Sequence, residues 1–338
     1  MDKGIAIAGT IVIDIIKIID SYPQTGELAK ILNVSSSVGG CVPNTAIDLK
    51  KLDPDLQVYA YGKIGRDQNG SYVNSVLEKY NVDVIGIVQE DICPTAASDV
   101  MTCKENGVRT VFYNGTSNET LSFYDIKGKI MENIDRIKIF HIGYINQLDK
   151  LLADDDEFGT ILASLLALIH SKGIITSIDL ASFRSDPNLI NKISTCIPYC
   201  DYIVINELEA GLMSQITIRD PICQKLNMEN MKKAAQAIVN MGLQAAIVVH
   251  APEGAYYVSR EMTVYVPSLH LPNNYIKGNV GAGDAFCAGV LFGLYHDFSP
   301  EKCLQLGVAC GAANLSESNA IDGMMSFQDV MKLSIKYQ

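Results

Sequence analysis

The stretch Gly278-Asn279-Val280-Gly281-Ala282-Gly283-Asp284 leads into the apolar segment 285–294, and it decides how the rest of the chain is interpreted. The segment 285–294 is apolar on every face, which predicts a buried helix. Small residues at its start let the backbone approach a ligand closely. The first N–H groups of a helix have no partner within the helix, so the amides of Gly281, Ala282 and Gly283 are predicted to form an anion site.

Asp284 is the unexpected member of this stretch, since a carboxylate repels the anion that the neighbouring amides attract. An aspartate is expected at this position if its carboxylate removes a proton from a nucleophile that attacks a bound phosphate. Alternatively, Asp284 only complements the helix dipole, and the stretch alone leaves both interpretations open. The stretch is not a Walker A loop, and Phe286 replaces the third glycine of a dinucleotide fingerprint.

Outward from this stretch, short apolar runs rich in β-branched residues alternate with helix-like segments, which is typical of a parallel sheet with crossover helices. Strands are expected at 5–8, 57–61, 84–88, 137–142, 174–178, 202–205, 246–250 and 255–258. Helices are expected at 43–52, 69–80, 157–171, 228–241, 282–296, 300–317 and 327–336. The chain, 1–338, is therefore predicted to be one large α/β body.

Two segments interrupt this alternation. Residues 97–113 are predicted to form a β-hairpin around Asn106-Gly107, and 10–37 has the character of extended, partly polar chain. Antiparallel pieces inserted into a parallel framework often cover a binding site. We therefore expect both segments to form a lid.

The composition excludes several classes of protein. Of 338 residues, 48% are hydrophobic and 19% charged, which allows a sizeable core and excludes general disorder. Lys and Arg number 27 against 38 Asp and Glu, a formal charge of −11 that disfavours nucleic acid and anionic membranes as partners. The apolar run 161–169 is too short to span a membrane, and we expect a cytoplasmic protein.

Cysteine and histidine give no metal-binding pattern in the sequence. The nine cysteines form no Cys-x-x-Cys pair and are expected to be free thiols in a reducing compartment. The five histidines show no ligand spacing and are interpreted as core or surface residues. The acidic run 154–157 is interpreted as a solvated helix start.

Several motifs together resemble the ribokinase-like (PfkB) carbohydrate kinases. The stretch 278–284 resembles the C-terminal signature of that family, Asp-Thr-x-Gly-Ala-Gly-Asp at the start of a buried helix. Segment 39–46 is similar to its Gly-Gly-x-x-x-Asn-x-Ala, 62–70 to its Gly-x-x-Gly-x-Asp-x-x-Gly, and 206–209 to its Asn-x-x-Glu. Matches in this order cover nearly the whole chain, from about residue 5 to 320.

The resemblance implies a three-layer α/β/α sandwich with a mostly parallel sheet and a small β-sheet lid. It also implies an ATP-dependent sugar kinase that uses Mg²⁺ and transfers the γ-phosphoryl group to a hydroxyl of a small carbohydrate. Many relatives dimerise through the lid, so a homodimer is expected.

Site positions carry over from the family residue by residue. The catalytic base falls on Asp284 and the anion hole on the amides at 281–283. The substrate-binding positions fall on Asp14, Gly39, Gly40 and Asn44. The cofactor-binding positions fall on Asn206, Glu209, Gly254 and Asn314, and Glu209 is expected to reach the metal through water.

The departures from the family pattern leave alternatives open. Gly278-Asn279 replaces the family's Asp-Thr, which leaves activation by a monovalent cation open, and Cys41 replaces a Lys of some members. The acceptor is alternatively a nucleoside or a sugar phosphate, which needs basic residues such as Lys30, Arg109 or Arg184. A non-catalytic sugar-binding regulator is the alternative outside the kinases, and Asn206 with Glu209 is alternatively a helix cap with an exposed Glu.

Overall fold

The computed structural model describes residues 3–105, 107–272 and 274–338. Within them, a nine-stranded sheet has the order β15-β14-β13-β12-β11-β8-β1-β4-β5. Neighbouring strands from β5 to β13 are parallel, and β14 and β15 add an antiparallel edge. The strands are β1 Gly4–Gly9, β4 Val58–Gly65, β5 Asp83–Glu90, β8 Ile137–Gly143, β11 Ile175–Ile178, β12 Tyr202–Asn206, β13 Ala246–Ala251, β14 Gly254–Ser259 and β15 Thr263–Pro267.

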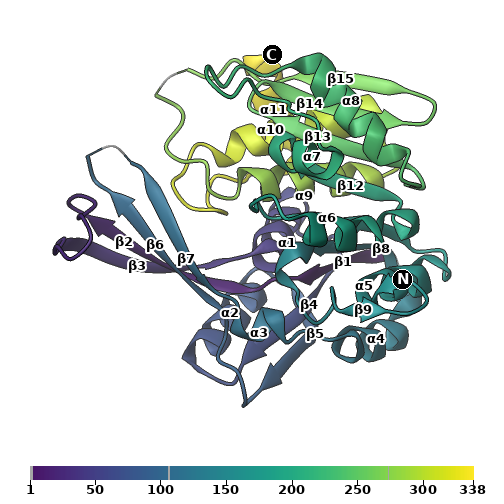
Figure 1. Ribbon diagram of the computed structural model, residues 1–338, viewed down its shortest axis with the longest axis horizontal. Coiled ribbons are helices and arrows are strands. Elements are labelled where there is room, and N and C mark those ends of the chain that lie inside the picture. The colour runs from purple at the N-terminus through teal and green to yellow at the C-terminus, as the bar shows by residue number, and fades with distance from the viewer. Residues whose placement is uncertain (1–2, 106, 273) are drawn as a thin grey trace.

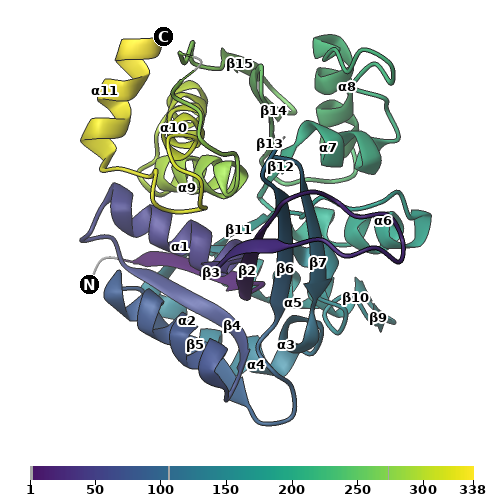
Figure 2. The same cartoon turned by 90° about the vertical axis from the view of Figure 1, so that its left-hand side faces the viewer.

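Helices cover both faces of this sheet (Figures 1 and 2). One face carries α1 Cys41–Leu52, α2 Gln68–Lys79, α9 Ala282–Tyr295, α10 Pro300–Asn314 and α11 Phe327–Tyr337. The other face carries α4 Phe123–Glu132, α5 Ile161–His170, α6 Pro187–Ser194, α7 Glu207–Ser214 and α8 Met228–Val239, and α3 is Thr116–Glu119. Short 3₁₀ helices are 134–136, 145–147 and 197–199. The three-layer sandwich expected from the sequence is confirmed.

Continuous apolar strands result from burial on both faces. In β1, Ile5 and Ile7 pack into the core beneath α1 and α9, whereas Ala6 and Ala8 pack into the opposite core. All four side chains are fully buried. A strand covered on both sides needs apolar residues at every position, which is why these runs do not alternate with polar residues.

A second, four-stranded sheet projects from the body (Figure 1). Its order is β3-β2-β6-β7, with β2 Val12–Ile19, β3 Ile31–Gly39, β6 Ala97–Cys103 and β7 Arg109–Asn114. The hairpin predicted at 97–113 is present as β6 and β7, while Asn106 in its turn lies outside the described residues. The segment 10–37 supplies β2 and β3, which pair antiparallel with each other, while β2 and β6 run parallel.

Some boundaries predicted from the sequence are also wrong. The helix expected at 157–171 begins at Ile161, because residues 154–155 and 159–160 pair as the small strands β9 and β10 and Thr160 caps the helix. The acidic run 154–157 is therefore not a helix start. Helices α4, α6 and α7 and the edge strand β15 were not predicted. In the described part of the chain, no helix is both long and apolar enough to cross a membrane.

Candidate active site

The site lies where the N-terminal ends of α1 and α9 meet the carboxyl ends of β1, β8, β11 and β12. Side chains at the carboxyl ends of adjacent parallel strands converge on one edge of the sheet. The two helices pack against each other, so residues from opposite ends of the chain come together there. Asp284 in the first turn of α9 and Asn44 in the first turns of α1 are both buried.

Asp284 is held between two hydrogen-bond donors. The Asn44 Nδ2 donates to Asp284 Oδ2 at 2.9 Å, and the Tyr144 hydroxyl donates to Oδ1 at 2.7 Å. Burial raises the pKa of Asp284 to about 6, the two hydrogen bonds lower it, and the charge of Asp14 raises it. The group is therefore poised to gain or lose a proton near neutral pH, as a general base requires.

Asp14 reaches the same region from β2. Burial raises the pKa of Asp14 to about 6, against the lowering effect of a hydrogen bond with Ser98. A Cβ on Gly39 would overlap the Asp14 carboxylate, so that carboxylate occupies the space that a side chain would fill. Gly40, the residue before α1, has φ 86°, and a Cβ there would lie 2.7 Å from the Thr10 carbonyl oxygen. Asp14 lies within a strand and does not terminate one.

The loop before α9 passes close to the neighbouring backbone. Gly281 has φ 73°, and a Cβ there would lie 2.5 Å from the Ala320 carbonyl oxygen. The Ala282 amide makes a long bond of 3.4 Å to the Asn279 carbonyl, while a helix provides no partner for the Gly283 amide. Asn314 is fully buried behind the loop, where its Nδ2 donates to the Val280 carbonyl at 2.7 Å.

A pocket of about 660 Å³ opens on the other side of the same helix end. Asn206, Gly254, Ala282 and Gly283 belong to its lining, together with Asn279. Its remaining wall is largely apolar and includes Leu269, Leu271, Ile276, Phe286, Val308 and Leu315. The start of α9 thus separates this pocket from the Asp284 carboxylate.

Asn206 and Glu209 form a reciprocal cap at the start of α7. The Asn206 Oδ1 accepts from the amides of Leu208 and Glu209, and the Glu209 carboxylate accepts from the Asn206 amide and side chain at 3.0 and 2.7 Å. The capped-helix alternative is confirmed in this respect. The exposure that this alternative expected for Glu209 is wrong, because Glu209 is buried. Burial also raises its pKa.

Tyr144 and Asp179 were not predicted from the sequence. Tyr144 has the left-handed values φ 45° and ψ 53° directly after β8, which aims its hydroxyl at Asp284. Asp179 follows β11, and burial together with the charges of Glu209 and Asp284 raises its pKa well above its usual range. Their position immediately after two predicted parallel strands is the signal that could have found them.

Lys30 and Arg109 do not join this group. Both lie toward the far end of the projecting sheet. There the backbone amide of Lys30 donates to Asp20 Oδ1, and Arg109 is the strand partner of Thr102. Arg184 is exposed on the loop after β11. The basic cluster that a sugar-phosphate acceptor requires is therefore not assembled from these residues on the described chain.

Comparisons with known proteins identify the family and the fold of the chain. The pfkB family carbohydrate kinases match residues 2–326. The probable chloroplastic fructokinase-6 of Arabidopsis thaliana is 25% identical over 94% of this chain and 80% of its own, and the deoxyribokinase of Salmonella typhi is 23% identical over 83% and 82%. Among solved structures, Arabidopsis thaliana ribokinase complexed with ribose and ATP covers 99% of both chains with a TM-score of 0.80 at 19% identity.

Proposed function

The chain belongs to the pfkB family of carbohydrate kinases, and from that premise we propose that it transfers the γ-phosphoryl group of ATP to a hydroxyl of a small sugar, with Asp284 as the base. The observation that carries this proposal is the buried Asp284 carboxylate, held by Asn44 and Tyr144 in the first turn of α9. A residue that only complemented the helix dipole would not need burial or two side-chain donors.

Asp284 and the backbone amides at 281–283 have different roles in the proposed reaction. Asp284 accepts the proton of the acceptor hydroxyl as its oxygen forms a bond to the γ-phosphorus. The bond between the γ-phosphorus and the bridging oxygen breaks, and ADP leaves. The amides at 281–283 face the oxygens of the transferring group, where fixed dipoles stabilise charge without reorganisation.

The sugar is proposed to lie on the Asp14 side of Asp284. The Asn44 Oδ1 is buried and has no hydrogen-bond partner among the described residues. An unsatisfied buried acceptor costs about 1–3 kcal/mol, and a sugar hydroxyl donating to it would remove that cost. Asp14, with the glycines 39 and 40 that leave room beside it, offers a second acceptor for a hydroxyl.

ATP is proposed to occupy the pocket beside Gly283. Its apolar wall suits the adenine ring, while Asn206, Gly254 and the α9 amides lie at its polar parts. Asn314 contributes from behind, since its bond to Val280 holds the loop in shape. The position of Gly283 between this pocket and Asp284 allows the γ-phosphate to face both.

A magnesium ion fits the residues present through water. Glu209 and Asp284 are buried carboxylates, and no Lys or Arg forms an ion pair with either of them within the described ranges. The Glu209 oxygens already hold the α7 cap, so Glu209 would orient the water molecules around the ion. Mg²⁺, when bound with ATP, neutralises phosphate charge.

The base assignment is tested by comparing Asp284→Asn with Asp329→Asn. Asp329 occupies the same first-turn position of α11 but is exposed. Both variants lose the dipole contribution, whereas only Asp284→Asn loses the base. We expect kcat to fall by 10²-fold or more in Asp284→Asn alone, measured as ADP release over a panel of pentoses, hexoses, sugar acids, sugar phosphates and nucleosides. Near-normal kcat with ATP binding intact would refute the assignment.

The lid sheet is proposed to pair with that of a second copy. Ile31, Leu32, Val34 and Phe112 are all more than 40% exposed on its outer strands. Exposed apolar edge strands are prone to pair with other chains unless they are covered. A homodimer joined through this sheet would cover them.

A further inference from the structure

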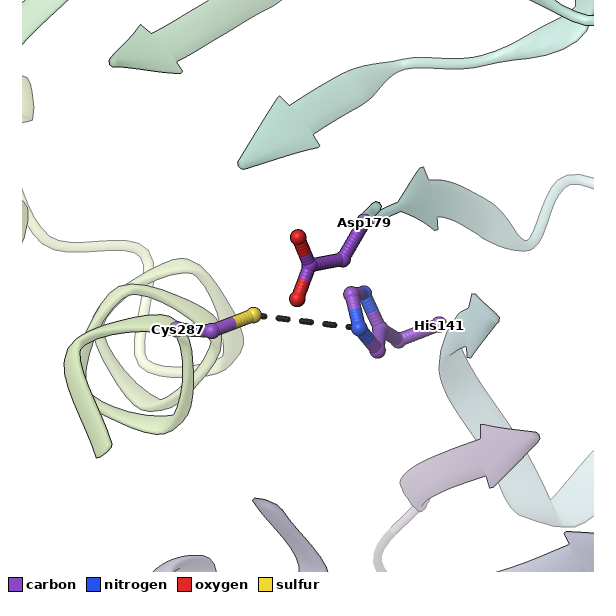
Figure 3. Close-up of side chains that lie close together, drawn as sticks. All are labelled: His141, Asp179 and Cys287. Atoms are coloured by element: carbon purple, nitrogen blue, oxygen red, sulfur yellow. Dashed lines mark hydrogen bonds between the residues drawn. The ribbon is translucent and has the colours of Figure 1, made fainter. Parts of the chain in front are cut away.

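Three potential metal ligands meet behind Asp284. His141 lies in β8, Asp179 follows β11 and Cys287 lies in α9 (Figure 3). All three are buried, and one ligand atom of each lies within 4.8 Å of the others. We propose that these residues bind a thiophilic divalent transition-metal ion, for which Zn²⁺ is the best match.

The His141 and Cys287 atoms are placed as such an ion requires. The Cys287 Sγ and His141 Nε2 are 3.8 Å apart. With Zn–S of about 2.3 Å and Zn–N of about 2.0 Å, tetrahedral ligands stand about 3.5 Å apart, so only a small adjustment is needed. The His141 Nδ1 pairs with the Ser177 hydroxyl at 3.0 Å. Such a partner on the second nitrogen orients a ligating histidine and leaves Nε2 free for the metal.

The charge of Asp179 also favours a cation here. Its carboxylate is buried, with Glu209 and Asp284 as its charged neighbours. Its Oδ1 accepts a bond of 2.6 Å from the Leu180 amide, and no Lys or Arg in the described chain forms an ion pair with it. A buried carboxyl group is costly to ionise without a cation, and a metal ion bound to it would offset that cost.

Cys41 lies beside this group but is not one of the three residues whose ligand atoms meet. A Cβ on Gly143 would overlap the Cys41 sulfur and would lie 3.3 Å from His141 Nε2. The thiol and the imidazole therefore flank the same small space, which Gly143 leaves open. One thiolate, an imidazole and a carboxylate form a donor set suited to zinc and poorly suited to Mg²⁺, which takes oxygen ligands.

Such an ion would fix the start of α9. Cys287 is three residues after Asp284, so both side chains lie on the same side of the helix. The ion would join β8, β11 and α9 at the point where the Asp284 carboxylate must be held. It is separate from the ion that accompanies ATP, because its sulfur and nitrogen ligands lie in the core rather than in the pocket lining.

The proposal is tested on the full chain, refolded in the presence of Zn²⁺ because the ligands are buried, and then passed over a chelator and a sizing column. We expect about one zinc per chain, with X-ray absorption showing sulfur at about 2.3 Å and nitrogen or oxygen at about 2.0 Å. A folded chain without zinc, or zinc surrounded by oxygen and nitrogen only, would overturn the proposal. This measurement requires no variant.

Variants then locate the site. Cys287→Ser and His141→Gln are expected to retain at least tenfold less zinc than the parent. Cys196→Ser is the matched control, since Cys196 is also a buried thiol, with Thr160 as a polar neighbour, but lies in the other core. Circular dichroism confirms that each variant folds. Equal zinc in Cys287→Ser and the parent would contradict the assignment, and a variant that fails to fold leaves the absorption result to decide.

Discussion

Replacing Tyr144 with Phe is expected to move the acidic limb of the pH–rate profile. In the proposed mechanism the ionised Asp284 carboxylate is the active form, so activity is expected to rise with pH through its pKa of about 6 and to be lost as pH falls below it. The Tyr144 hydroxyl donates to this carboxylate at 2.7 Å and stabilises its charged form. Its removal therefore raises the pKa of Asp284.

The size of the effect follows from the strength of one hydrogen bond to a charged group. Such a bond contributes about 1.5–3 kcal/mol, and one pKa unit corresponds to about 1.4 kcal/mol, so the limb should move upward by about one to two units. At pH 7 the ionised fraction of Asp284 would fall from about nine tenths to between about a half and a tenth. We expect kcat/KM at pH 7 to fall about two- to tenfold, and the two enzymes to converge near pH 9.

The assay is kcat/KM from pH 5 to 9, with ADP release as the readout. Tyr61→Phe is the matched control, because Tyr61 is buried and its hydroxyl has no hydrogen-bond partner in the described chain. Tyr61→Phe should leave the limb in place. If the Tyr144→Phe profile superimposes on that of the parent, or falls equally at every pH, Tyr144 does not tune Asp284 and the reasoning is refuted.

Three further predictions concern stability, the loop and the lid. Asp48 is buried with both carboxylate oxygens unpaired, and burial raises its pKa well above its usual value. Because Asp48 ionises more readily in the unfolded chain, it lowers the stability of the parent as pH rises above about 4. Asp48→Asn should therefore melt about 2 °C or more above the parent at pH 8 and no higher than the parent at pH 4. Gly281→Ala should lower kcat by about 10²-fold through its contact with the Ala320 carbonyl, whereas Gly173→Ala, with φ 74° and open space around it, should leave kcat unchanged; equal kcat in both variants would count against the anion hole. Phe112→Asp should shift a dimeric parent to monomer in light scattering, and a parent that is already monomeric would exclude the lid dimer.

The sequence predicted the parallel sheet well because its strands are buried on both faces. The runs at 5–8 and 202–205 lie inside β1 and β12. A strand covered on both faces needs apolar residues at every position, so a continuous apolar run indicates such a strand. The same reasoning missed β15, whose alternate residues are exposed. It also extended the helix at 157–171 too far, because the pairing of β9 with β10 depends on contacts outside the local pattern.

The candidate site was predicted in part. Asp284, Asp14 and Asn44 were identified from their motifs, and the structure brings Asn44 into contact with Asp284 and Asp14 close enough to affect its pKa. Asn206 and Glu209 were identified too, but the sequence left open that they cap α7 with a buried Glu209. Tyr144 carries no motif, because its role follows from a left-handed backbone turn.

The sequence by itself determined the elements that carry local information. The Gly281-Ala282-Gly283-Asp284 turn requires a positive φ and a helix start, and both requirements act within a few residues. Only the tertiary structure decided which side chains surround Asp284 and that His141, Asp179 and Cys287 meet behind it. Cys287 and His141 are 146 positions apart, and Asn44 and Asp284 are 240 positions apart. They meet because parallel strands bring their carboxyl ends to one edge, against which α9 packs.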